Sequence, residues 1–204
     1  MSDFSPEEVQ KMLDNLDNFS DEEVTEIEKM VDELDARRKN KIAHDDLIAF
    51  CKRMMPDFIV GKHHRIFPAW YLGRNPDKKV MMVSHTTDLA VDFGRKVRNL
   101  LGLQDYKDIF PDVKLATDSK SAGRWNTNMG GEYYACGVGS ALAGRGAHLL
   151  LVDDPHSEQD VINGNFSVFE KAYEWFTFGA RTRLMPGGSV AIIQTRWHMD
   201  DLTG

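Results

Sequence analysis

Residues 1–55 combine long polar stretches with apolar positions at helical spacing. Ser5-Pro6-Glu7-Glu8 and Ser20-Asp21-Glu22-Glu23 each have the form of a helix N-terminus, in which the serine caps the first turn and the second glutamate completes a capping box. After the second box, one helix face carries Val24, Ile27, Val31 and Leu34. A third helix is predicted from Asp45 to Met55, ending before Pro56. We therefore expect a leader of two or three amphipathic helices.

From residue 56 the pattern changes to short apolar runs separated by amphipathic segments. The predicted elements are, in chain order, a strand at Lys79–Ser84, a helix at Thr87–Leu101, short antiparallel strands within 113–136, a strand at Leu149–Val152, a helix at Ser167–Leu184 with a capping box from Ser167 to Glu170, and a strand at Val190–Gln194 introduced by Pro186-Gly187-Gly188. Strands that alternate with helices indicate an α/β fold with a mainly parallel sheet. We divide the chain into the helical leader, residues 1–55, and an α/β domain, residues 56–204.

The charge of the chain is unevenly distributed. The 204 residues carry a net charge of −7. Residues 1–36 hold 13 acidic and two basic side chains, for a net charge of −11, whereas the remainder holds 23 basic and 19 acidic ones, for +4. The leader is compatible with a solvated helical face or a partner-binding appendage, and the body with contact to nucleic acid.

The sequence argues against membrane-spanning and secreted classes of protein. The longest aliphatic run, Leu149–Val152, is too short to cross a bilayer, and the N-terminus lacks the basic and apolar regions of a signal peptide. Cys51 and Cys136 do not form a disulfide framework of the kind that secreted domains use, so a reducing compartment is expected.

Two carboxylates, Asp153 and Asp154, directly follow the apolar run and precede Pro155. Since α/β proteins bind ligands at the carboxyl ends of their strands, this pattern is typical of a nucleotide site. The first carboxylate would hold Mg²⁺, and the second would polarise an attacking water. A simple strand-ending turn explains the same residues, because Asp and Pro are common in turns.

Two further segments carry candidate chemistry. Arg145 lies between glycines in Gly144-Arg145-Gly146, where a mobile loop could bring its guanidinium to a phosphate; an exposed turn is the alternative. Thr195 opens Thr195-Arg196-Trp197-His198 after the last predicted strand, where its hydroxyl could sense a hydrolysed phosphate; ordinary strand-end polarity is the alternative.

These segments occur in an order that resembles a known family. The set comprises Phe67-Pro68-Ala69-Trp70-Tyr71-Leu72-Gly73, Ser84-His85-Thr86, Gly123-Arg124-Trp125-Asn126-Thr127, Gly137-Val138-Gly139, the stretch from Gly144 to Pro155, and Thr195-Arg196-Trp197-His198. From about Asp57 to Gly204 the chain resembles the large subunit of phage terminases, the motor ATPase that packages DNA into capsids.

The resemblance implies a role for each candidate residue. Asp153 matches the Mg²⁺-holding Walker B aspartate, and Asp154 stands where the family keeps its catalytic carboxylate, which is glutamate in many members. Arg145 corresponds to an arginine that completes the ATP site of a neighbouring subunit. Thr195 corresponds to the motif that couples hydrolysis to DNA movement.

The resemblance also implies the setting in which the protein acts. ATP and Mg²⁺ would be its cofactors. Its partners would be double-stranded DNA, the terminase small subunit, the portal protein and further copies of itself in a ring, with no membrane involved. The location would be the host cytoplasm, at the procapsid portal.

The Walker A phosphate loop that this family needs is missing. Its pattern is G-x-x-x-x-G-K-[ST], but Gly61-Lys62 is followed by His63, and Pro56 stands in the place of the first glycine. In relatives the loop lies between segments that correspond to Ile66 and Phe67, which are adjacent here. We therefore expect a partial, P-loop-NTPase-like domain over residues 56–204 that has lost a strand, the loop and most of a helix.

The sequence is compatible with an inactive part of an enzyme and with a binding module. The nuclease domain of the family would follow Gly204 and is absent from this sequence. We expect part of a packaging ATPase that is inactive alone. The alternative is a non-catalytic module, derived from a terminase, that binds DNA or packaging proteins. A helicase-like ATPase would need the same missing loop and leaves the terminase-like segments unexplained.

Overall fold

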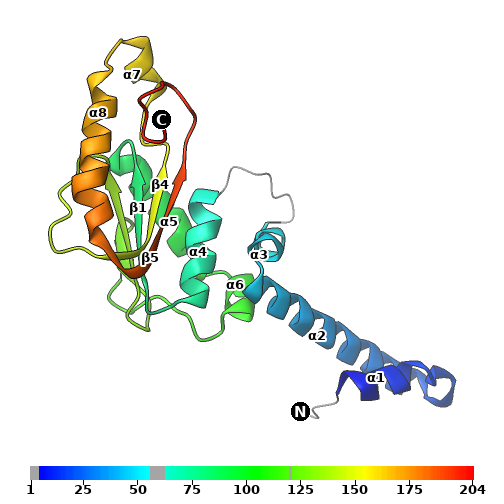
Figure 1. Cartoon of the computed structure of the whole chain (residues 1–204). Helices are drawn as coiled ribbons and strands as arrows, with labels where there is room; N and C mark the ends of the chain where they lie inside the picture. The colour runs from blue at the N-terminus through cyan, green and yellow to red at the C-terminus, as the bar shows by residue number, and fades with distance from the viewer. Residues whose placement is uncertain (1–4, 56–62, 120) are drawn as a thin grey trace.

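The computed structural model describes residues 5–55, 63–119 and 121–204, which form a projecting helical arm and an α/β body (Figure 1). Pro56 and Gly61-Lys62, which bear on the missing phosphate loop, lie outside the described residues. None of the described helices is both long and apolar enough to span a membrane.

A five-stranded sheet in the order β2-β3-β1-β4-β5 forms the centre of the body. Its strands are β1 (Lys79–Ser84), β2 (Arg124–Asn126), β3 (Glu132–Gly137), β4 (Ala147–Asp153) and β5 (Leu184–Ile193). β3, β1, β4 and β5 run parallel, and β2 pairs antiparallel with β3 at one edge. The predicted α/β fold with a mainly parallel sheet is confirmed. The prediction for 113–136 is half right, because β3 is also an interior strand parallel to β1.

Helices cover both faces of the sheet. α4 (His63–Arg74), α5 (Thr87–Leu101) and α6 (Gln104–Ile109) lie on one side, and α8 (Ser167–Glu174) lies on the other, while α7 (Glu158–Ile162) lies beyond the carboxyl ends of the strands (Figure 1). Alternate residues of each central strand face opposite helix layers, so Leu149 and Leu151 pack in one cluster and Leu150 and Val152 in the other.

The region predicted as the helix Ser167–Leu184 has three conformations. The α-helix ends at Glu174, a π-helix spans Trp175–Ala180, and a 3₁₀ turn spans Arg181–Arg183 before β5 begins. The predicted capping box is wrong, because the N-cap residue is Phe166 and the Ser167 hydroxyl donates to the Asn165 side chain at 3.3 Å instead.

The N-terminal helices are α1 (Pro6–Leu13), α2 (Asp21–Asp45) and α3 (Leu47–Met54). Both predicted capping boxes are confirmed; at the second, the Glu23 carboxylate accepts from the Ser20 N–H at 2.8 Å. α3 buries Phe50, Cys51 and Met54 in the same core as α4 and α5, which anchors the arm to the body.

Helix α4 contains the junction at which family segments were expected to be missing. Ile66 and Phe67 occupy successive positions of one continuous helix, and Pro68 lies inside it. Ile66, Ala69 and Leu72 are buried in the core. The five strands form a single hydrogen-bonded sheet, in which β4 pairs with β1 on one side and β5 on the other.

Candidate functional site

The carboxyl ends of the four parallel strands form one hydrogen-bonded edge. The Val138 N–H donates to the Ser84 carbonyl at 2.9 Å, the His85 N–H to the Asp154 carbonyl at 3.2 Å, and the Asp154 N–H to the Ile193 carbonyl at 2.9 Å. These bonds continue the pairing just beyond the strands. They fix the starts of the loops after β1, β3 and β4 relative to one another.

Asp153 is the last residue of β4, and its side chain belongs to the buried interior. The residue is 5% exposed, and strand alternation places it on the same face as Leu151, under α4 and α5. On the neighbouring strand β1, Ser84 follows Val83, the register partner of Val152. The Ser84 hydroxyl is fully buried and has no hydrogen-bond partner among the described residues. Two oxygen-bearing side chains therefore end adjacent strands on one face.

Tyr133 links this buried face to the rest of the core. Its ring stacks on Trp125 with centroids 4.9 Å apart. Its hydroxyl is buried and, within the described part of the chain, accepts and donates no hydrogen bond. Burial raises the pKa of Tyr133 strongly, and the negative charge of Asp153 raises it further. The charge of Asp153 thus acts on the interior below the sheet edge.

Asp154 turns away from Asp153. Among the described residues it is the one non-glycine residue with positive φ, at 42°, a left-handed conformation that Asp tolerates better than most residues. Its side chain is exposed, and its Oδ1 accepts from the Thr195 N–H at 3.0 Å. Two predicted site residues are therefore in direct contact. Of the two carboxylates, Asp154 is exposed and Asp153 is buried.

Arg145 lies apart from these residues. It precedes β4, whereas Asp153 and Asp154 end and follow it. Its guanidinium stacks over the Tyr134 ring at 4.0 Å from the centroid and lies 3.6 Å from the carboxylate of Glu132, the first residue of β3. Arg145 therefore belongs to the amino end of the sheet within its own chain. A role in a neighbouring subunit's site stays a prediction.

Asp201, which the sequence did not single out, organises the segment after β5. It is 3% exposed. Its carboxylate accepts from the Gln194 side chain at 2.8 Å, the Arg196 Nε at 2.8 Å, and the backbone N–H groups of Trp197, His198 and Thr203. Burial acts to raise the pKa of Asp201, but the bonds from Arg196 and the backbone outweigh it and lower the pKa. The segment that contains Thr195 is thus folded around one carboxylate.

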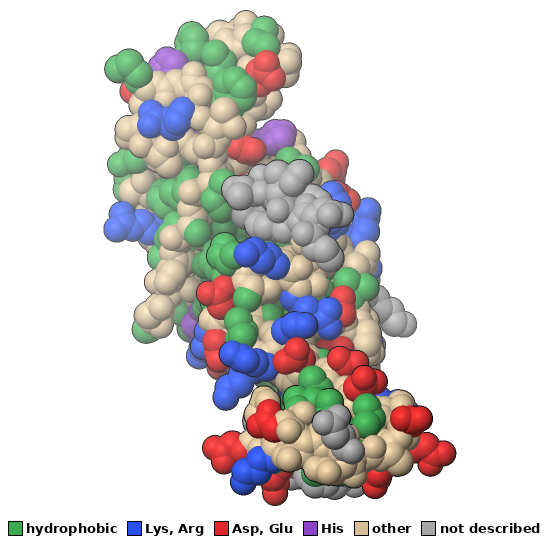
Figure 2. Space-filling view, turned by 90° about the vertical axis from the view of Figure 1, so that its right-hand side faces the viewer, with side chains coloured by type: hydrophobic (Ala, Val, Ile, Leu, Met, Phe, Trp, Pro, Cys, Tyr) green, Lys and Arg blue, Asp and Glu red, His purple; other side chains and the backbone are tan. Residues whose placement is uncertain are grey.

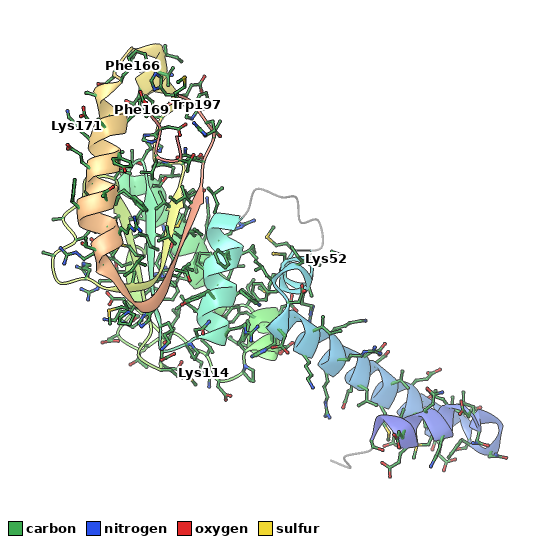
Figure 3. The ribbon with its side chains drawn as sticks, in the orientation of Figure 1. Lys52, Lys114, Phe166, Phe169, Lys171 and Trp197 are labelled. Atoms are coloured by element: carbon green, nitrogen blue, oxygen red, sulfur yellow. The ribbon has the colours of Figure 1, made fainter. Side chains whose placement is uncertain are left out.

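His156 fastens the same segment to α8. The residue is 5% exposed, its Nε2 accepts from the Leu202 N–H at 3.1 Å, and its ring packs edge-on against Phe169 with centroids 4.7 Å apart. Burial lowers the pKa of His156, which favours the neutral imidazole that this hydrogen bond needs. Figure 3 shows Phe166, Phe169 and Trp197 at this end of the molecule.

Neither a protein-family model nor a curated protein sequence matches this chain. The residues at the sheet edge are therefore the basis for a functional proposal. Three of the four predicted site residues, Asp153, Asp154 and Thr195, come together there, and Arg145 does not.

The oxygen donors at the edge can be compared with the needs of the Mg²⁺ that the resemblance implies. Among the residues that the structure describes, no group of three or more His, Cys, Asp or Glu side chains is arranged to hold a metal ion. However, Mg²⁺ often takes only one or two carboxylates and completes its shell with water and phosphate oxygens. Asp153 and the unpartnered Ser84 hydroxyl match that use. They fit a nucleotide-bound Mg²⁺ better than a free ion.

Asp201 and His156 illustrate what the sequence analysis missed. In the sequence, His156 follows Pro155 without a motif of its own, and Asp201 belongs to no motif. Their contacts join residues 156 and 201–202 across the end of the sheet, so no local spacing signals them. The one available signal was general: if the last ten residues are folded, their polar groups need hydrogen-bond partners.

Proposed function

We propose that this chain is part of a terminase-type large subunit, the ATPase that drives packaging of viral DNA. One observation carries the proposal. The hydrogen bond from Thr195 to Asp154 joins the acidic pair after β4 to the coupling-like segment after β5, at the carboxyl edge of a parallel sheet. Ligands of α/β proteins bind at this edge of the sheet, and the Mg²⁺-holding aspartate of a P-loop NTPase would lie there.

The proposed roles follow from where each side chain lies. Asp153, with Ser84 beside it, would hold the Mg²⁺ of a bound nucleotide, and the ion would neutralise charge that develops on the phosphates. Asp154 has one carboxylate oxygen bonded to the Thr195 N–H, which leaves the second to orient a water molecule. A movement of the Asp154 carboxylate would shift Thr195 through their hydrogen bond. The hydrogen bonds of Asp201 to Arg196 and Trp197 would pass that movement to the rest of the segment.

The proposal includes inactivity of the chain alone. The sequence contains no G-x-x-x-x-G-K-[ST] loop, so no lysine or ring of backbone amides is available to cradle the outer phosphates. A separate polypeptide would have to supply that loop. We expect phosphate release from Mg²⁺-ATP by the purified full chain to equal that of an Asp153→Ala variant. Turnover that depends on Asp153 would refute this part of the proposal.

Nucleotide binding tests the proposal itself. A fluorescent ATP analogue should bind the full chain weakly, with binding that strengthens when Mg²⁺ is added. Asp153→Asn should abolish the Mg²⁺ effect while keeping the side-chain volume. Asp200→Asn is the matched control, because Asp200 lies in the same region with an 83% exposed side chain. If Mg²⁺ has no effect on binding by the unmodified chain, the nucleotide-handling function is wrong.

A second candidate function is a terminase-derived module that binds DNA without catalysis. It is favoured by the missing phosphate loop and by the +4 net charge outside residues 1–36. Contacts to phosphates would make the affinity for duplex DNA fall steeply with salt. Fluorescence anisotropy with a labelled duplex at about 0.05 M and about 0.2 M salt tests this. No binding at the lower salt concentration would exclude the DNA-binding part.

A further inference from the structure

Helices α1 and α2, here called the arm, project from the α/β body (Figure 1). The 25 residues of α2 span about 37 Å at 1.5 Å per residue. Among the described residues of the arm, only Val9, Ile27 and Ala43 are buried. A helix this long with so little buried surface gains little stability from packing within its own chain.

The apolar face of α2 continues beyond the part that α1 covers. Val24, Ile27, Val31 and Leu34 repeat at the three-and-four spacing of a helix-packing seam. Ile27 is 4% exposed, but Val31 and Leu34 remain partly exposed. They floor a groove of about 460 Å³, which is lined by Val9, Gln10, Leu13, Val31, Leu34, Asp35, Arg37, Arg38 and Lys41. The groove is therefore apolar along its floor and basic at the end nearer the body.

The charges of α2 are divided along its length. Residues 21–35 hold eight acidic side chains and one lysine, whereas residues 36–45 hold four basic side chains and one aspartate. Figure 2 shows acidic side chains gathered at the outer end of the arm and basic ones nearer the body. The helix dipole favours such a bias only within the first and last turns. It does not explain acids that extend over the first fifteen residues.

We propose that the arms of two copies of this chain pair antiparallel about a two-fold axis near Val31 and Leu34. Antiparallel pairing places the acidic half of each α2 against the basic half of the other, whereas parallel pairing would place like charges together. The groove of each copy would then receive the acidic half of the second α2, and the four helices would share an apolar core. The same surface serves both copies, so the assembly closes at two.

The inference does not depend on the proposed nucleotide function. It predicts a monomer–dimer equilibrium for the full chain, measured by sedimentation equilibrium over a range of protein concentrations. The dissociation constant should rise about tenfold or more between about 0.05 M and about 0.5 M salt, because the pairing of charges is screened. A monomer at every concentration in low salt would overturn the proposal.

Charge reversal provides the sharper test. One variant carries Arg37→Glu and Arg38→Glu, which makes its whole arm acidic. Another carries Glu26→Lys and Glu28→Lys, which makes the outer half of the arm less acidic and places lysines where the second copy presents Arg37 and Arg38. Each alone should dimerise at least about tenfold more weakly than the unmodified chain. An equimolar mixture should recover dimers as a heterodimer. Failure of the mixture to recover dimers, with both variants helical by circular dichroism, would overturn the pairing.

A matched pair of apolar substitutions tests the groove. Leu34→Ser removes part of its floor, whereas Ile42→Ser changes a 49% exposed residue of the same helix that does not line it. Leu34→Ser should weaken the dimer about tenfold or more and Ile42→Ser should leave it unchanged. Equal effects of the two substitutions, or a dimer that survives all of the arm variants, would show that the copies associate through another surface.

Discussion

Substitutions at Asp154 can separate two structural requirements of this position, a left-handed backbone and a hydrogen-bond acceptor. The backbone there is left-handed, with φ at 42°, and the carboxylate accepts a hydrogen bond from the Thr195 N–H at 3.0 Å. Asparagine meets both demands, because it tolerates the left-handed region and keeps an oxygen acceptor. Glycine meets the first alone. Alanine meets neither.

The expected losses of stability follow from these two terms. Losing a hydrogen bond to an exposed carboxylate costs about 0.5–1 kcal/mol, at the low end of the range for charged acceptors because water replaces part of it. Holding alanine in the left-handed region costs about 1 kcal/mol more than holding glycine there. We therefore expect Asp154→Asn to be nearly neutral, Asp154→Gly to lose about 0.5–1 kcal/mol, and Asp154→Ala to lose about 2 kcal/mol.

Thermal unfolding and hydrogen exchange check the two terms separately. For a chain of this size, 1 kcal/mol corresponds to about 2–4 °C in Tm. Exchange at the Thr195 amide should accelerate in both the glycine and the alanine variants and stay slow in the asparagine variant. If glycine leaves the Thr195 amide as protected as before, the contact does not hold the segment after β5. If alanine and glycine lower Tm equally, the left-handed backbone is not strained.

Three further predictions concern the buried polar groups. Tyr133→Phe should leave the free energy of unfolding unchanged or raise it by up to about 1 kcal/mol, because it removes an unpartnered hydroxyl. Tyr106→Phe should cost about 1 kcal/mol, because it removes a 3.0 Å hydrogen bond to a backbone carbonyl. Equal changes in Tm would contradict this. The pKa of His156 lies below its usual 6.5 in the folded protein, so the neutral ring contributes its full stability above pH 6.5 and that contribution is lost as the pH falls toward the lowered pKa. On acidification, Tm should therefore fall less in a His156→Gln variant than in the unmodified chain. Asp201→Ala should cost about 2–3 kcal/mol, because it leaves several hydrogen-bond donors unpaired, of which Arg196 is half-exposed. It should also speed proteolysis of the last ten residues. Proteolysis no faster than in the unmodified chain would exclude Asp201 as the residue that organises this segment.

Elements with local signals could be predicted from the sequence. β1 and α5 occupy the predicted ranges, because the apolar run of the strand and the apolar periodicity of the helix are both local patterns. α2 was underestimated, since the polar residues from Asp35 to Asp45 lack apolar periodicity but keep good helix propensity. The start of β5 was missed because Pro186-Gly187-Gly188 predicts a turn.

In the structure those residues lie inside β5, where the register with β4 shifts between Ala147 and Leu149. Gly187 has a φ of 75°, and a Cβ at Gly188 would meet the Met185 carbonyl at 2.8 Å. The glycines therefore allow an irregular strand rather than a turn. Only the pairing with β4, which is remote in the sequence, distinguishes these outcomes.

At the candidate site, too, some features follow from local sequence and others depend on residues that are remote in the sequence. Asp153, Asp154 and Thr195 could be placed at one edge because parallel strands share their carboxyl ends. The direction of the Asp154 carboxylate could not be predicted. Successive residues of a strand already point to opposite faces, and the left-handed backbone at Asp154 turns its carboxylate to the end of β5.

That divergence gives the two carboxylates different chemistry. Asp153 sits in a buried setting, where its charge reaches Tyr133, whereas Asp154 is exposed and bonded to the backbone of the next segment. A buried carboxylate is suited to hold a cation that compensates its charge. An exposed one that touches Thr195 is suited to respond to what binds and to move its neighbour. The proposed difference in role thus follows from strand alternation together with the left-handed backbone at Asp154.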